Sequence, residues 1–188
     1  MIPARVLSLF AAMAAIALPA VAGPLDLDAG LRASIYDDNY KLGVGGSLGL
    51  VQNLGPKFDL GLHLNYSRFR AKTVDWDDIN ELGGYLTAYM VPTLADQPFS
   101  LRIGPHGGAA MLGDDWYGDV GGDVMAVFKI ADKTQFYGTF IPSFFIGKES
   151  QAMIRIGFGI EYRLADGSSS SAPASGGSGT GYEGATGP

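Results

Sequence analysis

The chain has 188 residues and no cysteine, which excludes disulfide bonds, thiolate metal sites and the lipid-anchoring cysteine of a bacterial lipoprotein. Its net charge of -6, without a basic stripe, argues against nucleic acid as a partner. Glycine contributes 28 residues with no Gly-X-Y period, which indicates a crowded, curved β-sheet rather than collagen.

The first 22 residues have the three parts of a secretory signal peptide. Arg5 supplies a positive charge, residues 6–17 form an apolar run, and Ala20, Val21 and Ala22 form a small-residue cleavage site. An uncleaved membrane helix is the alternative, but the apolar run is short and Pro19 follows it closely. The sequence therefore predicts a signal peptide over residues 1–22 and a mature chain outside the cytoplasm.

From residue 25 onward, apolar residues alternate with polar or small ones. In residues 151–164 every even position is apolar, and most odd positions are polar or glycine. Because successive side chains of a β-strand point to opposite faces, such a strand has one apolar and one polar face. The same alternation recurs in seven earlier segments. The predicted strands are residues 25–35, 40–51, 58–67, 81–91, 99–111, 119–130, 135–146 and 151–164.

Eight amphipathic segments joined by turns predict an all-β fold, namely an eight-stranded antiparallel transmembrane up-and-down β-barrel over residues 23–164. The sheet must close, because no backbone N–H or C=O group can face hydrocarbon unpaired. A water-soluble eight-stranded barrel is the alternative. Beyond residue 164 the chain is rich in Gly and Ser, which predicts a flexible tail over residues 165–188.

A periplasmic N-terminus assigns each connection to one side of the membrane. Periplasmic turns are then expected at residues 52–57, 92–98 and 131–134, and outward segments at residues 36–39, 68–80, 112–118 and 147–150. Aromatic residues should ring the barrel at the lipid boundary. Those on the apolar faces at the periplasmic strand ends predict a periplasmic girdle of Phe58, Phe99, Phe128, Phe136 and Tyr162. Aromatic residues at the opposite ends are candidates for an outer girdle: Tyr36, Tyr40, Trp76, Trp116 and Tyr117.

The last predicted strand ends in Gly-Ile-Glu-Tyr-Arg-Leu, residues 159–164. With the strands placed, this segment is similar to the closing strand of the small eight-stranded outer-membrane barrels typified by OmpA and OmpX. The resemblance implies a location in the bacterial outer membrane, with outer-membrane lipid and lipopolysaccharide as surroundings. It also implies that Gly159, Tyr162 and Leu164 form the signal read by the barrel-assembly machinery. The family usually has Phe where this chain has Leu164.

Charged residues gather on the faces that the alternation turns inward. An eight-stranded barrel is only wide enough to be filled by side chains, so these charges must pair or be hydrated. The sequence predicts a lumen ion-pair network of Asp26, Asp28, Arg32, Glu81, Arg102, Asp123, Arg155 and Glu161, with Lys41, Asp59, His63 and His106 on the same faces. A narrow water-filled path through the lumen is the alternative.

Two histidines and two prolines raise the question of an enzyme. The outer-membrane lipid A deacylases and palmitoyltransferases are also eight-stranded barrels, and the deacylases place His and Ser two residues apart on a strand. Here the residue two positions after His63 is Asn65, and the residue two positions after His106 is Gly108, so the His–Ser pattern is missing. Pro105 and Pro142 fall in mid-strand, where we expect a local bulge in each strand. The alternative is a lateral gap for an acyl chain, of the kind that palmitoyltransferases use.

An acidic rim is predicted at the outward ends, formed by Asp37, Asp38, Asp75, Asp77, Asp78, Asp114, Asp115 and Glu149. Its spacing does not resemble an EF-hand, so a solvated rim is expected rather than a Ca²⁺ site. The sequence predicts no cofactor and no metal. It favours a non-enzymatic outer-membrane barrel with a structural or surface role, and a minor pore as an option. The alternative is a lipid-modifying enzyme of the lipid A deacylase or acyltransferase type.

Overall fold

The computed structural model describes residues 23–36, 39–73, 77–92 and 99–166. The predicted signal peptide and residues 167–188 of the predicted tail lie outside this range. The described chain forms eight strands: β1 (Leu25–Ile35), β2 (Gly43–Gly55), β3 (Phe58–Phe69), β4 (Ile79–Met90), β5 (Phe99–Leu112), β6 (Asp115–Lys129), β7 (Thr134–Ile146) and β8 (Gln151–Ala165). Among the described residues, no helix is long and apolar enough to cross a membrane.

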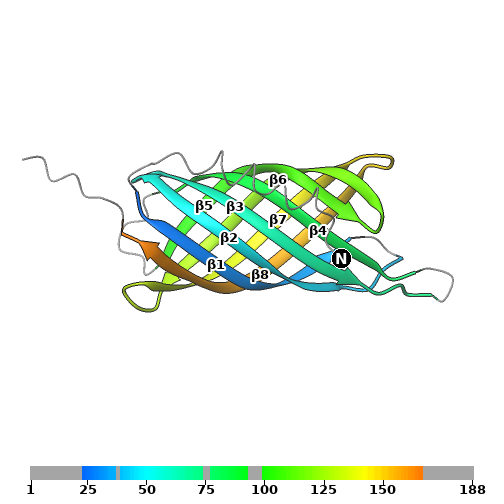
Figure 1. The fold of residues 1–188 in the computed structure, drawn as a ribbon, viewed down its shortest axis with the longest axis horizontal. Coiled ribbons are helices and arrows are strands. Elements are labelled where there is room, and N and C mark those ends of the chain that lie inside the picture. Colours follow the sequence, from blue (N-terminus) through cyan, green and yellow to red (C-terminus); the bar gives the residue numbers. More distant parts are fainter. Residues whose placement is uncertain (1–22, 37–38, 74–76, 93–98, 167–188) are drawn as a thin grey trace, which may run out of the picture.

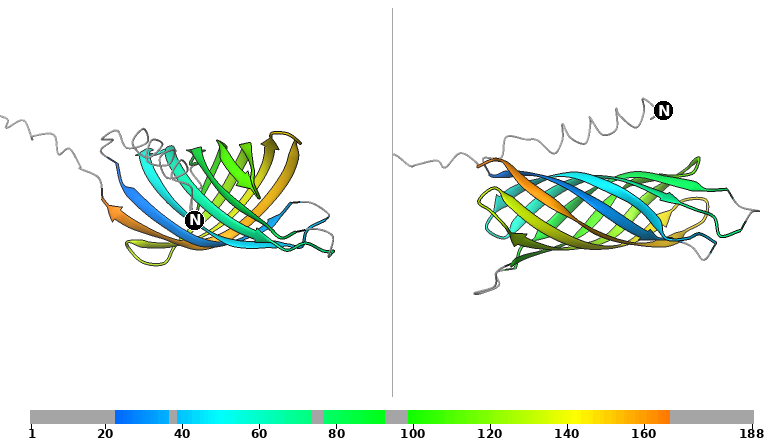
Figure 2. Two further views of the ribbon diagram at one scale, coloured as in Figure 1. Left: turned by 45° about the vertical axis from the view of Figure 1, so that its right-hand side comes forward. Right: turned by 90° about the horizontal axis from the view of Figure 1, so that it is seen from below.

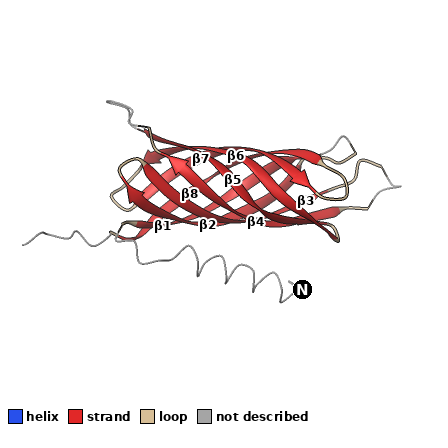
Figure 3. Cartoon of the chain, turned by 90° about the horizontal axis from the view of Figure 1, so that it is seen from above, coloured by secondary structure: helices blue, strands red, loops and turns tan. Residues whose placement is uncertain are grey.

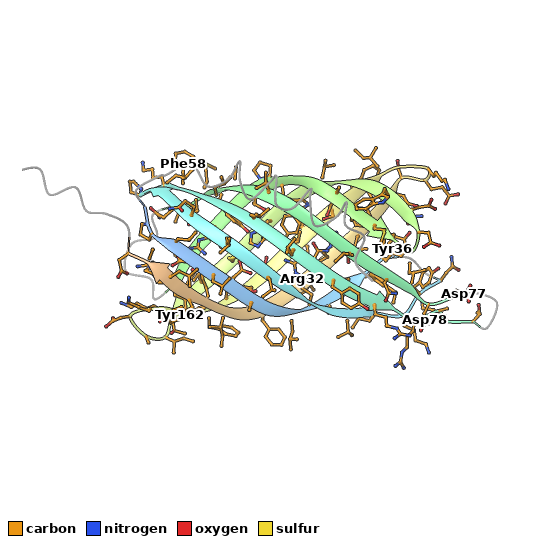
Figure 4. The ribbon with its side chains drawn as sticks, in the orientation of Figure 1. Arg32, Tyr36, Phe58, Asp77, Asp78 and Tyr162 are labelled. Carbon is orange, nitrogen blue, oxygen red and sulfur yellow. The ribbon has the colours of Figure 1, made fainter. Side chains whose placement is uncertain are left out.

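The eight strands form one closed barrel in which each strand pairs antiparallel with its neighbours in the sequence, and β8 pairs with β1. Figure 1 shows the strands tilted steeply against the long axis, and Figures 2 and 3 show the same ring from other sides. Pro24 and Asp166 lie at the same end of the barrel, which we call the terminal end. The opposite end, which includes Tyr36 and Asp78, is called the loop end (Figure 4).

The outside of this barrel is apolar and its inside is polar. Residues such as Leu31, Val44 and Ile156 are more than half exposed, whereas Glu81 and Arg155 are fully buried. Buried charges are tolerated only when they are paired or hydrogen-bonded, and an apolar exterior is stable only in an apolar medium. The alternative of a water-soluble barrel is therefore wrong, because its exterior would have to be polar.

Glycines make room for large side chains in the lumen. Gly30 of β1 lies opposite Gly159 of β8, and the hydroxyl end of Tyr137 lies against both. A Cβ atom at residue 159 would lie 2.7 Å from the Tyr137 hydroxyl oxygen and 2.6 Å from the Cα of Gly30. The alternation of glycine with large residues thus lets a narrow ring close around tyrosine and arginine side chains.

Several predicted strand boundaries differ from those of the structure, and two of the differences affect residues discussed above. β2 begins at Gly43 rather than at residue 40, so Lys41 is exposed outside the lumen and Tyr40 lies before the strand, in an isolated β-bridge with Ala71. The expected outward segment 112–118 is a turn of two residues, because β5 ends at Leu112 and β6 begins at Asp115.

The bulges expected at Pro105 and Pro142 are absent. In the pairing of β4 with β5, Thr87 pairs with His106 and the next pair is Met90 with Ile103, so two positions between them are unpaired. The register is the same before and after this gap, which means that no extra residue has been inserted. Pairing of β6 with β7 is likewise interrupted next to Pro142. Proline has no N–H to donate, so each ring interrupts the ladder on one side without adding a residue.

Candidate functional site

The lumen holds three layers of polar side chains, and the layer nearest the terminal end is centred on Arg102. The guanidinium of Arg102 donates from Nε to Asp59 at 2.7 Å and from Nη1 to Glu161. Its Nη2 lies 3.8 Å from Asp26, which also accepts a hydrogen bond from Arg163 at 3.1 Å. One planar guanidinium, with five N–H donors, therefore joins carboxylates of β1, β3 and β8. We call Arg102, Asp26, Asp59 and Glu161 the terminal belt.

The second layer is a chain of hydrogen-bonding groups that we call the middle belt: Asp28, His63, Tyr89 and Asp123. His63 Nδ1 lies 3.4 Å from Asp28, and His63 Nε2 lies 3.1 Å from the Tyr89 hydroxyl. Tyr89 donates its single hydroxyl proton to Asp123 at 2.6 Å. The contact with His63 therefore requires Nε2 of the imidazole to carry a proton. Thr139 donates to the other oxygen of Asp123 at 2.8 Å.

Arg32 is buried on the loop-end side of the middle belt, without a carboxylate partner among the described residues. Its one hydrogen bond runs from Nη2 to the Tyr85 hydroxyl at 2.6 Å, and its guanidinium lies 5.5 Å from the centre of the same ring. Its Nε and Nη1 have no hydrogen-bond partner in the described part of the chain. The predicted ion pair of Arg32 is wrong, because among the described residues its guanidinium contacts the hydroxyl and ring of Tyr85 instead of a carboxylate.

The third layer, called the loop belt, is formed by Arg155, Glu81, Asp119 and Ser143. Nη2 of Arg155 lies 2.7 Å from Glu81 and 2.8 Å from Asp119, and Nη1 donates to Ser143 at 2.6 Å. Asn65 donates a further hydrogen bond to Glu81. Arg155, Glu81 and Asp119 are completely buried, so each charge has exchanged its water shell for fixed partners.

The eight predicted network residues thus divide into separate groups. Asp26, Arg102 and Glu161 meet in the terminal belt, and Glu81 and Arg155 meet in the loop belt. The others, Asp28, Arg32 and Asp123, take histidine or hydroxyl partners rather than an ion pair with arginine or a carboxylate. Asp59 and Asp119 join the belts although neither was among those eight. Asp119 had one usable signal, since it lies on the same face of the strand as Asp123.

His106 brings together the chemical groups of a serine hydrolase without their required order. Its Nε2 lies 3.1 Å from the Ser143 hydroxyl oxygen and 3.3 Å from Asp119, whereas its Nδ1 has no partner within the described ranges. A general base needs a free Nε2 lone pair facing serine and a carboxylate on Nδ1. Ser143 also accepts from Arg155 inside the closed lumen, away from lipid. These side chains serve the loop belt, and acyl transfer is not favoured.

Carboxylates outnumber arginines in the buried lumen of the described chain. The seven buried carboxylates are those of Asp26, Asp28, Asp59, Glu81, Asp119, Asp123 and Glu161, and the three buried arginines are Arg32, Arg102 and Arg155. Any ion that entered this interior would therefore meet a field that attracts cations.

An apolar cluster lies next to the loop belt, toward the loop end. Phe69, Tyr117, Phe145 and Met153 are buried there, and we call this group the aromatic cap. The ring centres of Tyr117 and Phe145 are 6.1 Å apart, and the guanidinium of Arg155 lies 5.1 Å from the Phe145 ring centre. The cap therefore rests directly on the loop belt.

The cap changes the assignment of the predicted outer girdle. Tyr117 is buried in the cap, and Tyr36 and Tyr40 pack against it, so none of the three belongs to a lipid-facing ring. Trp116 is about half exposed on the outside, and Trp76 lies outside the described residues.

The residues of the predicted periplasmic girdle all lie at the terminal end. Phe58, Phe128, Phe136 and Tyr162 are exposed on the outside, and Figure 4 shows Phe58 and Tyr162 at this end. Phe99 is half-buried, with its ring centre 5.5 Å from that of Phe128. Their contact with the lipid boundary stays a prediction.

The residues of the predicted assembly signal lie together near the end of β8. Tyr162 and Leu164 are both about half exposed on the outer face, while Gly159 is fixed by close contacts with β1. Recognition by the barrel-assembly machinery stays a prediction.

The loop end carries the described part of the acidic rim. Asp78 accepts hydrogen bonds from the backbone N–H of Ala71 and from Arg68, both at 3.1 Å, and these bonds lower the pKa of Asp78. Asp115 binds Lys148 at 2.8 Å. Asp37, Asp38 and Asp75 lie outside the described residues. Within the described ranges, no three His, Asp or Glu side chains converge as a metal site requires.

No protein-family model and no curated protein matches this sequence. Among solved structures, the barrel is similar to Neisserial surface protein A, NspA, with 12% sequence identity and a TM-score of 0.57. The match covers 75% of this chain and 96% of NspA. It is also similar to Ail, the attachment invasion locus protein of Yersinia pestis, with 13% identity and a TM-score of 0.50. That match covers 74% of this chain and 99% of Ail.

The chain has the fold of the small eight-stranded outer-membrane barrels. At these identities the likeness concerns the fold alone, and it agrees with the apolar exterior and polar interior. The predicted eight-stranded transmembrane barrel is therefore confirmed, and its outer-membrane location follows from the fold.

Proposed function

We propose that this chain is a closed, non-enzymatic barrel of the bacterial outer membrane with a structural or surface role. In this proposal the terminal end faces the periplasm and the loop end faces outward. The observation that carries the proposal is the filled lumen. Three belts of hydrogen-bonded side chains and the aromatic cap occupy the interior, and the potential acyl-transfer groups are buried among them.

The orientation can be tested with single cysteines, because the natural chain has none. Asp114 is exposed in the turn between β5 and β6 at the loop end, and Asp132 is exposed in the turn between β6 and β7 at the terminal end. A membrane-impermeant maleimide should label Asp114→Cys on intact cells and leave Asp132→Cys unlabelled until the outer membrane is opened. Labelling in the reverse order would contradict the proposed surface role.

A cation-selective minor pore is the second candidate, and the surplus of lumen carboxylates favours it. The closed barrel should give no unitary current steps when the purified protein is added to a planar bilayer. Reproducible current steps that prefer potassium over chloride would contradict the closed barrel and support the cation-selective pore. The lipid-modifying alternative is tested separately by mass spectrometry of lipid A, which should be unchanged when the protein is deleted.

A further inference from the structure

An apolar groove lies on the outer surface at the terminal end, across β3, β4 and β5. Its volume is about 450 Å³, and it is lined by Lys57, Phe58, Met90, Val91, Pro92 and Ile103. Ligand sites typically have volumes of about 300–1,000 Å³. The groove is therefore large enough to hold part of a ligand rather than a single water molecule.

The groove arises from a step in the sheet. Met90 is the last residue of β4, and its partner on β5 is Ile103. Residues 99–102 continue β5 beyond this pair, and among the described strands they pair with β6 alone. Just above the pair, Pro105 interrupts the β4–β5 ladder. The groove therefore lies where β3 and β4 have both ended, at Phe58 and Met90, and β5 continues.

The groove combines apolar walls with one unpaired cation. Phe58, Met90 and Ile103 are exposed on the outer face, so a ligand can cover them. The other described cations of this end, Lys129, Lys133 and Arg163, each pair with a carboxylate. Lys57 forms no ion pair within the described part of the chain. Its long side chain can keep the ammonium group in the headgroup layer while its methylenes cover apolar surface.

We propose that this groove is a binding site for an anionic phospholipid of the periplasmic leaflet. One acyl chain lies against Phe58, Met90 and Ile103, and the lipid phosphate pairs with Lys57. The inference rests on the proposed function, because only a membrane barrel with its terminal end toward the periplasm presents the groove to that leaflet. An anionic phospholipid matches both parts of the groove, because its acyl chain fits the apolar walls and its phosphate fits the ammonium group of Lys57.

The test uses a single tryptophan as a reporter. Trp76 and Trp116, the two tryptophans of the chain, are replaced by Phe, and Phe58→Trp places the reporter at the groove. The barrel is folded into phosphatidylcholine vesicles that contain either brominated phosphatidylglycerol or brominated phosphatidylcholine at equal mole fraction. Bromine quenches tryptophan on contact. One lysine near an anionic surface predicts an apparent preference of about fivefold for the anionic lipid. Lys57→Gln should abolish this preference.

Two controls separate the groove from general attraction to the membrane. Lys133→Gln removes a charge at the same end that already pairs with Asp166, and it should leave the preference unchanged. A reporter at Phe136→Trp lies near Lys129, which pairs with Asp132, and should show no preference.

Three outcomes would overturn the lipid site: equal quenching by both lipids at residue 58, a preference that survives Lys57→Gln, or the same preference at residue 136. The barrel is checked independently by its migration on an SDS gel with and without boiling. A natural chain whose migration does not depend on boiling would contradict the proposed membrane barrel itself.

Discussion

Arg155 of β8 contacts Glu81 of β4, the strand directly opposite it in the ring of eight. Arg102 of β5 approaches Asp26 of β1 in the same way, again from the opposite wall. Backbone pairing connects each strand only to its two neighbours. The belts therefore supply the side-chain connections across the diameter of the barrel.

Replacement of Arg155 by Met should strongly destabilise the barrel. The change leaves Glu81 and Asp119 buried without their shared cation, and loss of one partner from a buried ion pair costs about 3–5 kcal/mol. Arg68→Met is the matched control, because its pair with Asp78 is largely exposed to solvent and should contribute little to stability. Reversible urea unfolding in detergent micelles measures both free energies. Equal, small losses would show that the loop belt contributes little to stability.

Gly159→Ala should be poorly tolerated, whereas Gly107→Ala should be nearly neutral. A Cβ atom at residue 159 would collide with the carbonyl oxygen of Ala29 and lie 2.7 Å from the Tyr137 hydroxyl oxygen. At residue 107 it would meet no atom within 4 Å. Overpacking costs about 1–3 kcal/mol. The same unfolding measurement should give the larger loss for residue 159, and an inverted order would contradict the packing described here.

Arginine should be costly on the outer face for a reason that does not apply in the lumen. Ile156→Arg places a charge in hydrocarbon and should cost about 2–4 kcal/mol near the middle of the membrane. Ser47→Arg places the charge in the crowded lumen, where the cost comes from the lack of space for the larger side chain and not from lipid. The loss of folding free energy relative to the natural chain, measured in vesicles, should depend on lipid chain length for Ile156→Arg and not for Ser47→Arg. The same dependence for both variants would contradict the assigned faces.

The contacts of Asp78 should make the loop end sensitive to acid. Because its pKa is lowered in the folded chain, the stabilisation from Ala71 and Arg68 is complete above the ordinary value of about 3.9. It is lost as the pH falls through the lower, folded pKa. An NMR titration should show the Ala71 amide resonance shifting at that lower pH, and Asp78→Asn should remove the transition. A midpoint at or above the ordinary value would refute this.

The period-two alternation was enough to predict the ring of strands and the face of most of their residues. Ile156 points outward and Arg155 inward, as their even and odd positions indicated. The prediction failed where the lumen itself becomes apolar. Tyr117 looked like a lipid-boundary residue, yet it is buried in the cap, because alternation separates two faces without identifying the medium beside each.

The partners across the lumen had no signal in the sequence. Arg155 binds Glu81 and Asp119, which precede it by 74 and 36 residues, so no local spacing could pair them. Their meeting depends on the shear of the closed ring, a property of all eight strands together. For the same reason, the contact of Arg32 with Tyr85, 53 residues further along the chain, had no local signal either.

The position of Arg155 on the final strand couples ring closure to charge neutralisation. Arg155 lies on β8, the strand whose pairing with β1 closes the ring. Its guanidinium is shared by Glu81 of β4 and Asp119 of β6. One strand therefore supplies both the seam of the barrel and the cation that neutralises two buried carboxylates.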